Sequence, residues 1–350
     1  MSGAGVEALR RVAYLLERAH EPTYRVKAFR SAAATIEALP SGELEQRLGT
    51  GTLEDLKGVG SAPAGVVVEA ERGEIPTYLR DAEALSWQPA DVAAGAGVGL
   101  RAALRGDCHT HSDWSDGGSP IEEMARAARD LGHEWLVLTD HSPRLTVANG
   151  LTAERLRRQL EVVRRLNDEL TPFRILTGIE VDILDDGSLD QEPALLAELD
   201  VVVASVHSKL RMPSKDMTPR MVAAIANPAT DVLGHCTGRN VTPRGRSGKL
   251  RPESEFDAEI VFEACRQFGV AVEINSRPER LDPPRRLLRL AVEMGCLFSI
   301  DTDAHAPGQL EWLVYGCARA EECGVPAERV INGKSADELL SWEHRIVGSG

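Results

Sequence analysis

Histidines and acidic residues recur between residues 107 and 305 in short clusters. Neutral imidazoles and carboxylates are the ligands that suit Zn²⁺, Mn²⁺ or Fe²⁺. One ion takes about four protein ligands or fewer. Eight or nine ligands that converge on one place therefore predict two or three divalent ions, with a carboxylate as a bridge. Six of the nine histidines belong to these clusters, which read Asp107-Cys-His109-Thr-His111, Thr-Asp140-His141, Gly-Ile-Glu180, Ser-Val-His207, Leu-Gly-His235 and Asp301-Thr-Asp303-Ala-His305.

Each cluster follows a short apolar or β-branched run, and amphipathic helical stretches separate the runs. The predicted strands lie just before His109 and at 135–139, 174–183, 200–206, 231–233, 270–274 and 297–300. Strands that alternate with helices predict an α/β fold with a parallel sheet, and seven such units favour a closed barrel. The carboxyl ends of the strands of a parallel barrel meet at one mouth, and enzymes with this fold have their active sites there. His20, His133 and His344 lie outside this pattern, and we do not expect them to be ligands.

A second region, residues 1–88, is predicted to be helical. Val6, Leu9, Ala13 and Leu16 recur at helical spacing. The glycine-rich stretch that follows has no periodicity. We therefore expect three parts, namely a helical domain at 1–88, a linker at 89–105 and the barrel at 106–350.

Composition excludes several classes of protein. The 350 residues are 43% apolar and 27% charged, which is ordinary for a globular chain. No apolar run approaches the roughly 18 residues of a membrane span, and no secretory signal is evident, so we expect a cytoplasmic protein without a membrane partner. A net charge of −14 disfavours nucleic-acid binding by bulk electrostatics. The six cysteines form no CxxC pair and are expected to be reduced. The oligomeric state is left open.

The barrel segments resemble the polymerase and histidinol phosphatase (PHP) family, and in particular the PHP domain of bacterial family X DNA polymerases. The matching segments read DCHTHSDWSDG (107–117), LTDHS (138–142), GIEVDI (178–183), ASVHS (204–208), LGHCTGR (233–239), VEINSRPERLD (272–282) and DTDAH (301–305). The resemblance implies a distorted seven-stranded barrel with a three-metal site. It assigns one ion to His109, His111, Glu180 and Asp303, a second to Asp116, His141 and His305, and a third to Glu180, His207 and His235. Asp113 is a competitor for the role of Asp116.

The resemblance also implies roles in hydrolysis. Clustered divalent ions lower the pKa of bound water and neutralise the charge of a phosphate. Glu180, as the bridge, and Asp303 are the predicted catalytic carboxylates. Arg239, Lys209 and Arg277 follow strand ends and are predicted to hold phosphate oxygens. Of these, Arg239 is also assigned to the catalytic group because it lies in the family-like GHCTGR segment.

The helical region resembles the helix-hairpin-helix domain that begins family X polymerases, on the strength of YRVKAFRSAA (24–33) and LKGVG (56–60). In such hairpins, glycines let backbone N–H groups approach a DNA phosphate. The implied DNA contacts are Gly58, Gly60, Lys27 and Arg30. Pro63 removes one N–H group from the hairpin. The lysines that the sugar-phosphate lyase homologues use are absent from these segments, so we expect no lyase activity. The helical domain meets the barrel after a short linker that cannot hold a polymerase palm, so we expect no polymerase activity.

These observations predict a metal-dependent phosphoesterase that acts on DNA ends, as a 3′→5′ exonuclease or a 3′-phosphatase in DNA repair. The alternative is a small-molecule phosphatase of the histidinol-phosphate type, which would share every metal ligand. An amidohydrolase is disfavoured because no lysine stands at a strand end to form the bridging carbamate. A non-catalytic DNA-binding protein with a structural barrel is a further alternative, and it predicts degraded ligands.

Overall fold

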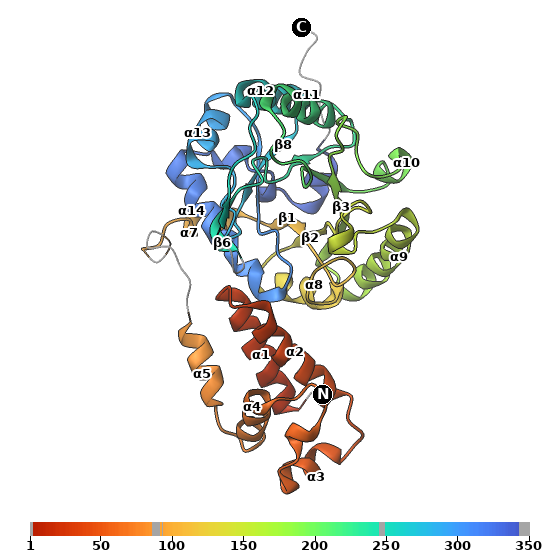
Figure 1. Ribbon diagram of the computed structural model, residues 1–350, viewed down its shortest axis with the longest axis vertical. Helices are drawn as coiled ribbons and strands as arrows, with labels where there is room; N and C mark the ends of the chain where they lie inside the picture. The colour runs from red at the N-terminus through yellow and green to blue at the C-terminus, as the bar shows by residue number, and fades with distance from the viewer. Residues whose placement is uncertain (1–2, 86–91, 93, 245–248, 343–350) are drawn as a thin grey trace. The chain divides into compact units, whose positions relative to one another are not determined.

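The structure is a computed structural model that describes residues 3–85, 92, 94–244 and 249–342. The chain divides into two compact units, Met1–Gln88 with Ala306–Gln309 and Pro89–His305 with Leu310–Gly350. Figure 1 labels most of their helices and several of their strands. None of the described helices is long and apolar enough to cross a membrane.

The first unit is helical. Its α-helices are α1 (Ala4–Arg18), α2 (Thr23–Glu37), α3 (Glu43–Thr50), α4 (Ser61–Glu71) and α5 (Thr77–Ala84). Helix α1 packs against α2 and α4, and its apolar residues Val6, Leu9, Ala13 and Leu16 are buried. The helical periodicity of the sequence therefore predicted the buried face correctly.

The second unit is a parallel barrel. Its strands are β1 (Gly106–Thr110), β2 (Trp135–Leu138), β3 (Arg174–Asp182), β4 (Val201–Ser205), β5 (Val232–Leu233), β8 (Ala271–Asn275) and β9 (Phe298–Asp301). They form one seven-stranded sheet in the order β1-β2-β3-β4-β5-β8-β9 with parallel pairing throughout. A parallel bridge between Thr110 and Ala304 brings its two edges together. The predicted α/β barrel is confirmed as a nearly closed seven-stranded one.

Helices alternate with the strands, as the sequence pattern predicts, and α7 (Val98–Ala103) precedes the first strand. The other helices described are α8 (Ile121–Asp130), α9 (Ala153–Leu170), α10 (Pro193–Leu196), α11 (Ser214–Ile225), α12 (Ala258–Phe268), α13 (Arg285–Glu293), α14 (Leu313–Cys323) and α15 (Ala336–Leu340). Helix α7 lies within the segment 89–105, which the sequence predicts to be a linker, and it packs against α14. Residues 89–91 and 93 of that segment, and His344, fall outside the described residues. The sequence also did not predict the hairpin of β6 (Asn240–Arg244) and β7 (Lys249–Arg251).

All six cysteines are buried in the second unit, and none forms a disulfide. Burial raises the pKa of Cys296 and of Cys317 to about 12. These thiols therefore pack as small apolar side chains.

His133 gives the barrel a predictable sensitivity to acid. It is buried, and its Nε2 lies 2.7 Å from Nη2 of Arg101. Burial, helped by the Arg101 charge, lowers the pKa of His133 to about 3. The unfolded chain, with an ordinary histidine pKa of about 6.5, binds the proton first as the pH falls. Stability is therefore lost progressively below about pH 6.5.

We expect His133→Gln to remove this component. The difference in the free energy of unfolding between the wild type and His133→Gln should change by about 1–2 kcal/mol between pH 6.5 and 5, at about 1.4 kcal/mol per pH unit. Urea titrations of both proteins at each pH measure it. A difference that stays constant with pH would contradict the prediction.

Candidate metal centre

The carboxyl ends of the barrel strands bring the predicted ligands together. Strand β1 carries His109 and continues into His111, and Glu180 lies in β3. His141, His207, His235, Asp303 and His305 each follow the end of a strand. The parallel order of the strands puts these ends at one mouth of the barrel. The rings of His109, His111, His141, His207, His235 and His305 accordingly form one chain of ring contacts, with centroids 4.2–6.2 Å apart.

Glu180 lies between two sets of imidazoles. Its Oε2 is 2.8 Å from Nδ1 of His141 and 3.3 Å and 3.6 Å from Nε2 of His109 and of His111. Its Oε1 is 2.8 Å from Nε2 of His235 and 3.1 Å from Nε2 of His207. Each carboxylate oxygen thus faces a different set of ring nitrogens. This is the geometry that a bridging carboxylate requires.

Three groups of side chains have ligand atoms within 4.8 Å of one another. They are His111, Asp116, His141 and His305; His109, His111 and Asp303; and His141, Glu180 and His207. The groups share His111 and His141, so their division differs from the one that the family resemblance implies. Eight of the nine predicted ligands belong to a group, and the ninth, His235, contacts Glu180. Asp116 belongs to a group and Asp113 does not.

The buried polar atoms of this cluster fit divalent cations. Among the described residues, both Glu180 oxygens and one or both ring nitrogens of His109, His111, His141, His207 and His235 lie in ion-pair range of one another but do not have the geometry of a hydrogen bond. Leaving a buried polar atom unpaired costs about 1–3 kcal/mol. Cations that accept imidazole and carboxylate lone pairs would satisfy all of these atoms together.

The charges inside the cluster hold its histidines in different protonation states. Burial alone would lower the pKa of His207, but the charges of Glu180 and Asp182 outweigh it and raise the pKa to about 9. Burial and the Arg280 charge lower the pKa of His235 to about 4. A cation binds neutral imidazole, so binding at His207 would release a proton at neutral pH.

Two carboxylates that the sequence did not single out orient ligand histidines. Glu273 Oε1 lies 2.7 Å from Nδ1 of His109, and the same carboxylate accepts a hydrogen bond from the His235 N–H. Asp182 lies 3.5 Å from Nδ1 of His207 and also accepts from its backbone N–H at 3.1 Å. Such partners set the ring orientation of metal-binding histidines. Their signal in the sequence is an acidic residue inside an otherwise apolar strand.

Asp140 holds the loop that carries Asp116. Its buried carboxylate accepts hydrogen bonds from the N–H of Ser112 at 2.8 Å and from Gln159 Nε2 at 2.6 Å. The hydroxyls of Ser112 and Ser115 donate to it as well, each at 2.5 Å. The sequence marks Asp140 only as the neighbour of His141, because its partners come from a loop and from helix α9.

The basic residues differ in what they contact. Arg277 lies 3.2 Å from Asp303 Oδ1 and Arg280 lies 3.0 Å from Asp303 Oδ2. Against the effect of burial, the two guanidinium charges hold the pKa of Asp303 well below its usual range. The sequence predicted Arg277 at this site and missed Arg280. Exposed Lys209 contacts Asp185 at 2.5 Å.

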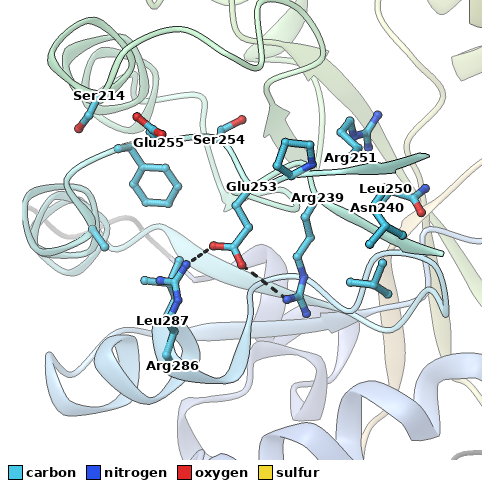
Figure 2. Close-up of a pocket in the computed structure, with 14 residues that line it drawn as sticks. Ser214, Arg239, Asn240, Leu250, Arg251, Glu253, Ser254, Glu255, Arg286 and Leu287 are labelled. Atoms are coloured by element: carbon cyan, nitrogen blue, oxygen red, sulfur yellow. Dashed lines mark hydrogen bonds and ion pairs between the residues drawn. The ribbon is translucent and has the colours of Figure 1, made fainter. Parts of the chain in front are cut away.

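Arg239 lies outside the three ligand groups. Its Nε donates to the carbonyl of Arg280 at 3.0 Å, its Nη2 donates to the carbonyl of Leu281, and its Nη1 lies 3.7 Å from Glu253. It lines a separate pocket (Figure 2). This geometry does not support the predicted phosphate contact of Arg239. Local sequence could not reveal that its partners lie about 40 residues downstream.

The predicted DNA contacts of the helical unit fall into two kinds. Gly58 has a φ of +92°, and Ser31 Oγ lies 2.9 Å from where a Cβ would stand, so only glycine suits this turn. Gly60 caps the N-terminus of α4, and Lys27 is exposed. Pro63 stands in the first turn of α4, where helix N–H groups have no intrahelical partner anyway.

Arg30, in contrast, is engaged inside the unit. Its Nε and Nη2 donate to the buried carboxylate of Glu17 at 2.9 Å and 3.0 Å. Glu17 also accepts from the backbone N–H of Gly308, in the short segment that clusters with this unit. The structure gives Arg30 a role in packing that its place in the sequence did not suggest.

We expect Arg30→Ala to destabilise the protein because it leaves the Glu17 carboxylate buried and without this partner. Breaking a buried pair costs about 3–5 kcal/mol. Chemical denaturation followed by circular dichroism measures the loss. Arg10→Ala, which breaks the exposed pair with Glu37, is the control and should cost about 1 kcal/mol or less. Equal effects in both variants would contradict the prediction.

A parallel barrel with this set of imidazoles and carboxylates at its carboxyl end defines a class, that of metal-dependent phosphoesterases. Comparison with known families agrees, since residues 107–277 match the PHP domain and residues 4–72 match a helix-hairpin-helix domain. The chain therefore carries a PHP domain behind an N-terminal helix-hairpin-helix domain.

Similar proteins include the "DNA polymerase/3′-5′ exonuclease PolX" of Bacillus subtilis (strain 168), which is 40% identical over 242 residues, 69% of this chain. The match spans 41% of the length of that polymerase. The "Probable phosphatase" of Thermoanaerobacter sp. (strain X514) is 29% identical over 69% of this chain and 97% of its own length. The crystal structure of histidinol phosphate phosphatase from Lactococcus lactis, in complex with zinc, L-histidinol and phosphate, shares 17% identity with a TM-score of 0.46, over 63% of this chain and 94% of that one.

Proposed function

We propose that this protein hydrolyses phosphate esters at the 3′ ends of DNA, as a 3′→5′ exonuclease or a 3′-phosphatase. The observation that carries the proposal is the presence in one chain of the ligand cluster around Glu180 and a helix-hairpin-helix domain with its Gly58 turn. The 40% identity to a polymerase that is also named as an exonuclease supports it.

In this proposal, the nine predicted ligands would hold ions of Zn²⁺, Mn²⁺ or Fe²⁺, and Glu180 would be shared between two of them. Such ions, when bound, lower the pKa of a water molecule and polarise a phosphoryl oxygen. Arg277 and Arg280 keep the Asp303 carboxylate anionic and oriented. Arg239 acts as a positioning residue, because its hydrogen bonds hold the backbone of Arg280 and Leu281.

A small-molecule phosphatase is the second candidate function. The relatives described as probable phosphatases align with this chain over nearly their whole length. Both candidates use the same metal ligands. The substrate therefore separates them, and the metal content does not.

The test uses Mn²⁺-reconstituted protein and a single-stranded oligonucleotide labelled at its 5′ end. The expected result is a ladder that shortens from the 3′ end, or release of phosphate from a 3′-phosphorylated oligonucleotide, with loss of both after chelation. An intact oligonucleotide, together with rapid hydrolysis of a small phosphomonoester by the same preparation, would overturn the DNA proposal in favour of the second candidate.

A further inference from the structure

A pocket with a volume of about 830 Å³ lies beside the β6–β7 hairpin, apart from the ligand cluster. Figure 2 shows residues of the hairpin on one side, helix α13 on another and the segment 252–258 between them. The volume is in the range of small-molecule sites, which is about 300–1,000 Å³. Nothing in the proposed hydrolysis uses this pocket directly.

Two buried hydrogen-bond donors line the pocket without a partner. Asn240 is 3% exposed and Ser254 is 7% exposed. Asn240 Oδ1 accepts from the N–H and the hydroxyl of Thr242, which orients the amide, whereas Asn240 Nδ2 and Ser254 Oγ have no hydrogen-bond partner among the described residues. Buried donors of this kind indicate an acceptor that comes from a bound molecule.

The charged lining adds to these donors. Three arginines, Arg239, Arg251 and Arg286, line the pocket against two glutamates, Glu253 and Glu255. Glu253 pairs with both Arg239 and Arg286, as the dashed lines in Figure 2 mark. Arg239 is also held by backbone carbonyls, so Arg251 and Arg286 are the arginines of the lining that would contact a phosphate. The lining carries an excess of one positive charge in a chain whose net charge is −14.

An apolar surface accompanies the charge. Phe256, Leu250 and Leu287 line the same pocket. Guanidinium groups bind phosphate, neutral donors bind the oxygens of a sugar or a base, and an aromatic ring offers a stacking surface for a base. A nucleotide offers a chemical partner for each of these three features.

The pocket shares a wall with the ligand cluster. Arg239 donates to the carbonyls of Arg280 and Leu281, and the side chain of Arg280 contacts Asp303 at 3.0 Å. One loop thus contacts both a residue that lines the pocket, Arg239, and a residue of the ligand cluster, Asp303.

We propose that this pocket binds a nucleotide of the DNA strand upstream of the 3′ end that is hydrolysed. The proposal rests on the proposed function and adds a subsite to it. A free mononucleotide has the same chemistry, so the test must separate the two sources.

The test compares the hydrolysis of a 12-nucleotide single strand with that of a dinucleotide, for Ser254→Ala and Arg286→Ala. Each variant should raise the KM of the long substrate, relative to that of the dinucleotide, by about 5-fold, because one hydrogen bond or charged contact of about 1 kcal/mol is lost. Arg289→Ala is the matched control, since Arg289 lies on the same helix and pairs with an exposed glutamate, Glu322, outside the pocket. It should leave both KM values unchanged.

The outcomes separate the two proposals. Cleavage of DNA with the same KM ratio in Ser254→Ala, Arg286→Ala and the wild type would overturn the pocket alone. Binding of thymidine monophosphate that weakens in both variants, with an unchanged KM ratio, would overturn the strand subsite in favour of a free nucleotide. Failure of the wild type both to cleave and to bind the 12-nucleotide strand, measured by fluorescence anisotropy, would overturn the proposed function and the pocket together.

Discussion

Glu180→Gln should abolish hydrolysis of every phosphate ester and lower the metal content of the protein. The substitution preserves the shape of the side chain but removes the negative charge that faces ring nitrogens of five histidines. An amide also cannot bridge two cations through two anionic oxygens. The contribution of such ions to catalysis is several kcal/mol, so the expected loss in kcat is about 10³-fold or more.

Two measurements on the same preparation check this prediction. Elemental analysis after dialysis gives the metal per chain, and kcat is measured with a small phosphodiester so that DNA binding does not enter. Glu198→Gln, an exposed residue on the same unit, is the control and should behave like the wild type. Full metal content with normal kcat in Glu180→Gln would show that Glu180 is not the bridge.

Asp303→Asn should reduce kcat by about 10³-fold as well, but with the fold retained. The amide keeps the shape of the side chain, and its single oxygen can still accept from one of the two arginines, Arg277 at the Oδ1 position or Arg280 at the Oδ2 position. What is lost is the anionic ligand beside His111, whose Nε2 lies 3.4 Å from Asp303 Oδ1. The circular dichroism spectrum and DNA affinity should remain close to those of the wild type.

The matched control for Asp303→Asn is Asp113→Asn, because Asp113 lies in the ligand-bearing loop but belongs to none of the three groups. It should keep wild-type kcat, whereas Asp116→Asn in the same loop should not. A wild-type protein without turnover, whose DNA binding is unchanged by Asp303→Asn, would instead support the non-catalytic alternative.

Much of the barrel and of its ligand cluster could be predicted, because residues that end successive strands of a parallel barrel lie close together in space. Strand ends meet at one mouth, so His109, Glu180 and His235 could be grouped without any knowledge of their distances. The residues that the sequence missed are those whose role depends on a partner in another element. Glu273 reads as part of an apolar strand, and Arg280 reads as one of several loop cations. Their functions follow only from contacts with His109 and Asp303.

The dependence on a partner in another element also explains why the predicted roles of two basic residues are not supported by the geometry. Arg30 and Arg239 stand in segments that resemble binding motifs, and the type of residue fits an anion in both cases. Glu17 lies 13 positions from Arg30, on a different helix, and the carbonyls that hold Arg239 lie on the loop that follows β8. In both cases groups of the protein itself hold the guanidinium group, which gives the side chain a role in packing.

The six buried cysteines can be used to measure how often the barrel opens. A thiol reagent can modify them only in molecules whose second unit has opened, since no thiol of the folded chain is exposed. The first unit contains no cysteine, so its local unfolding gives no signal. The rate of modification, followed with and without Mn²⁺, therefore measures the free energy by which bound ions hold the barrel closed.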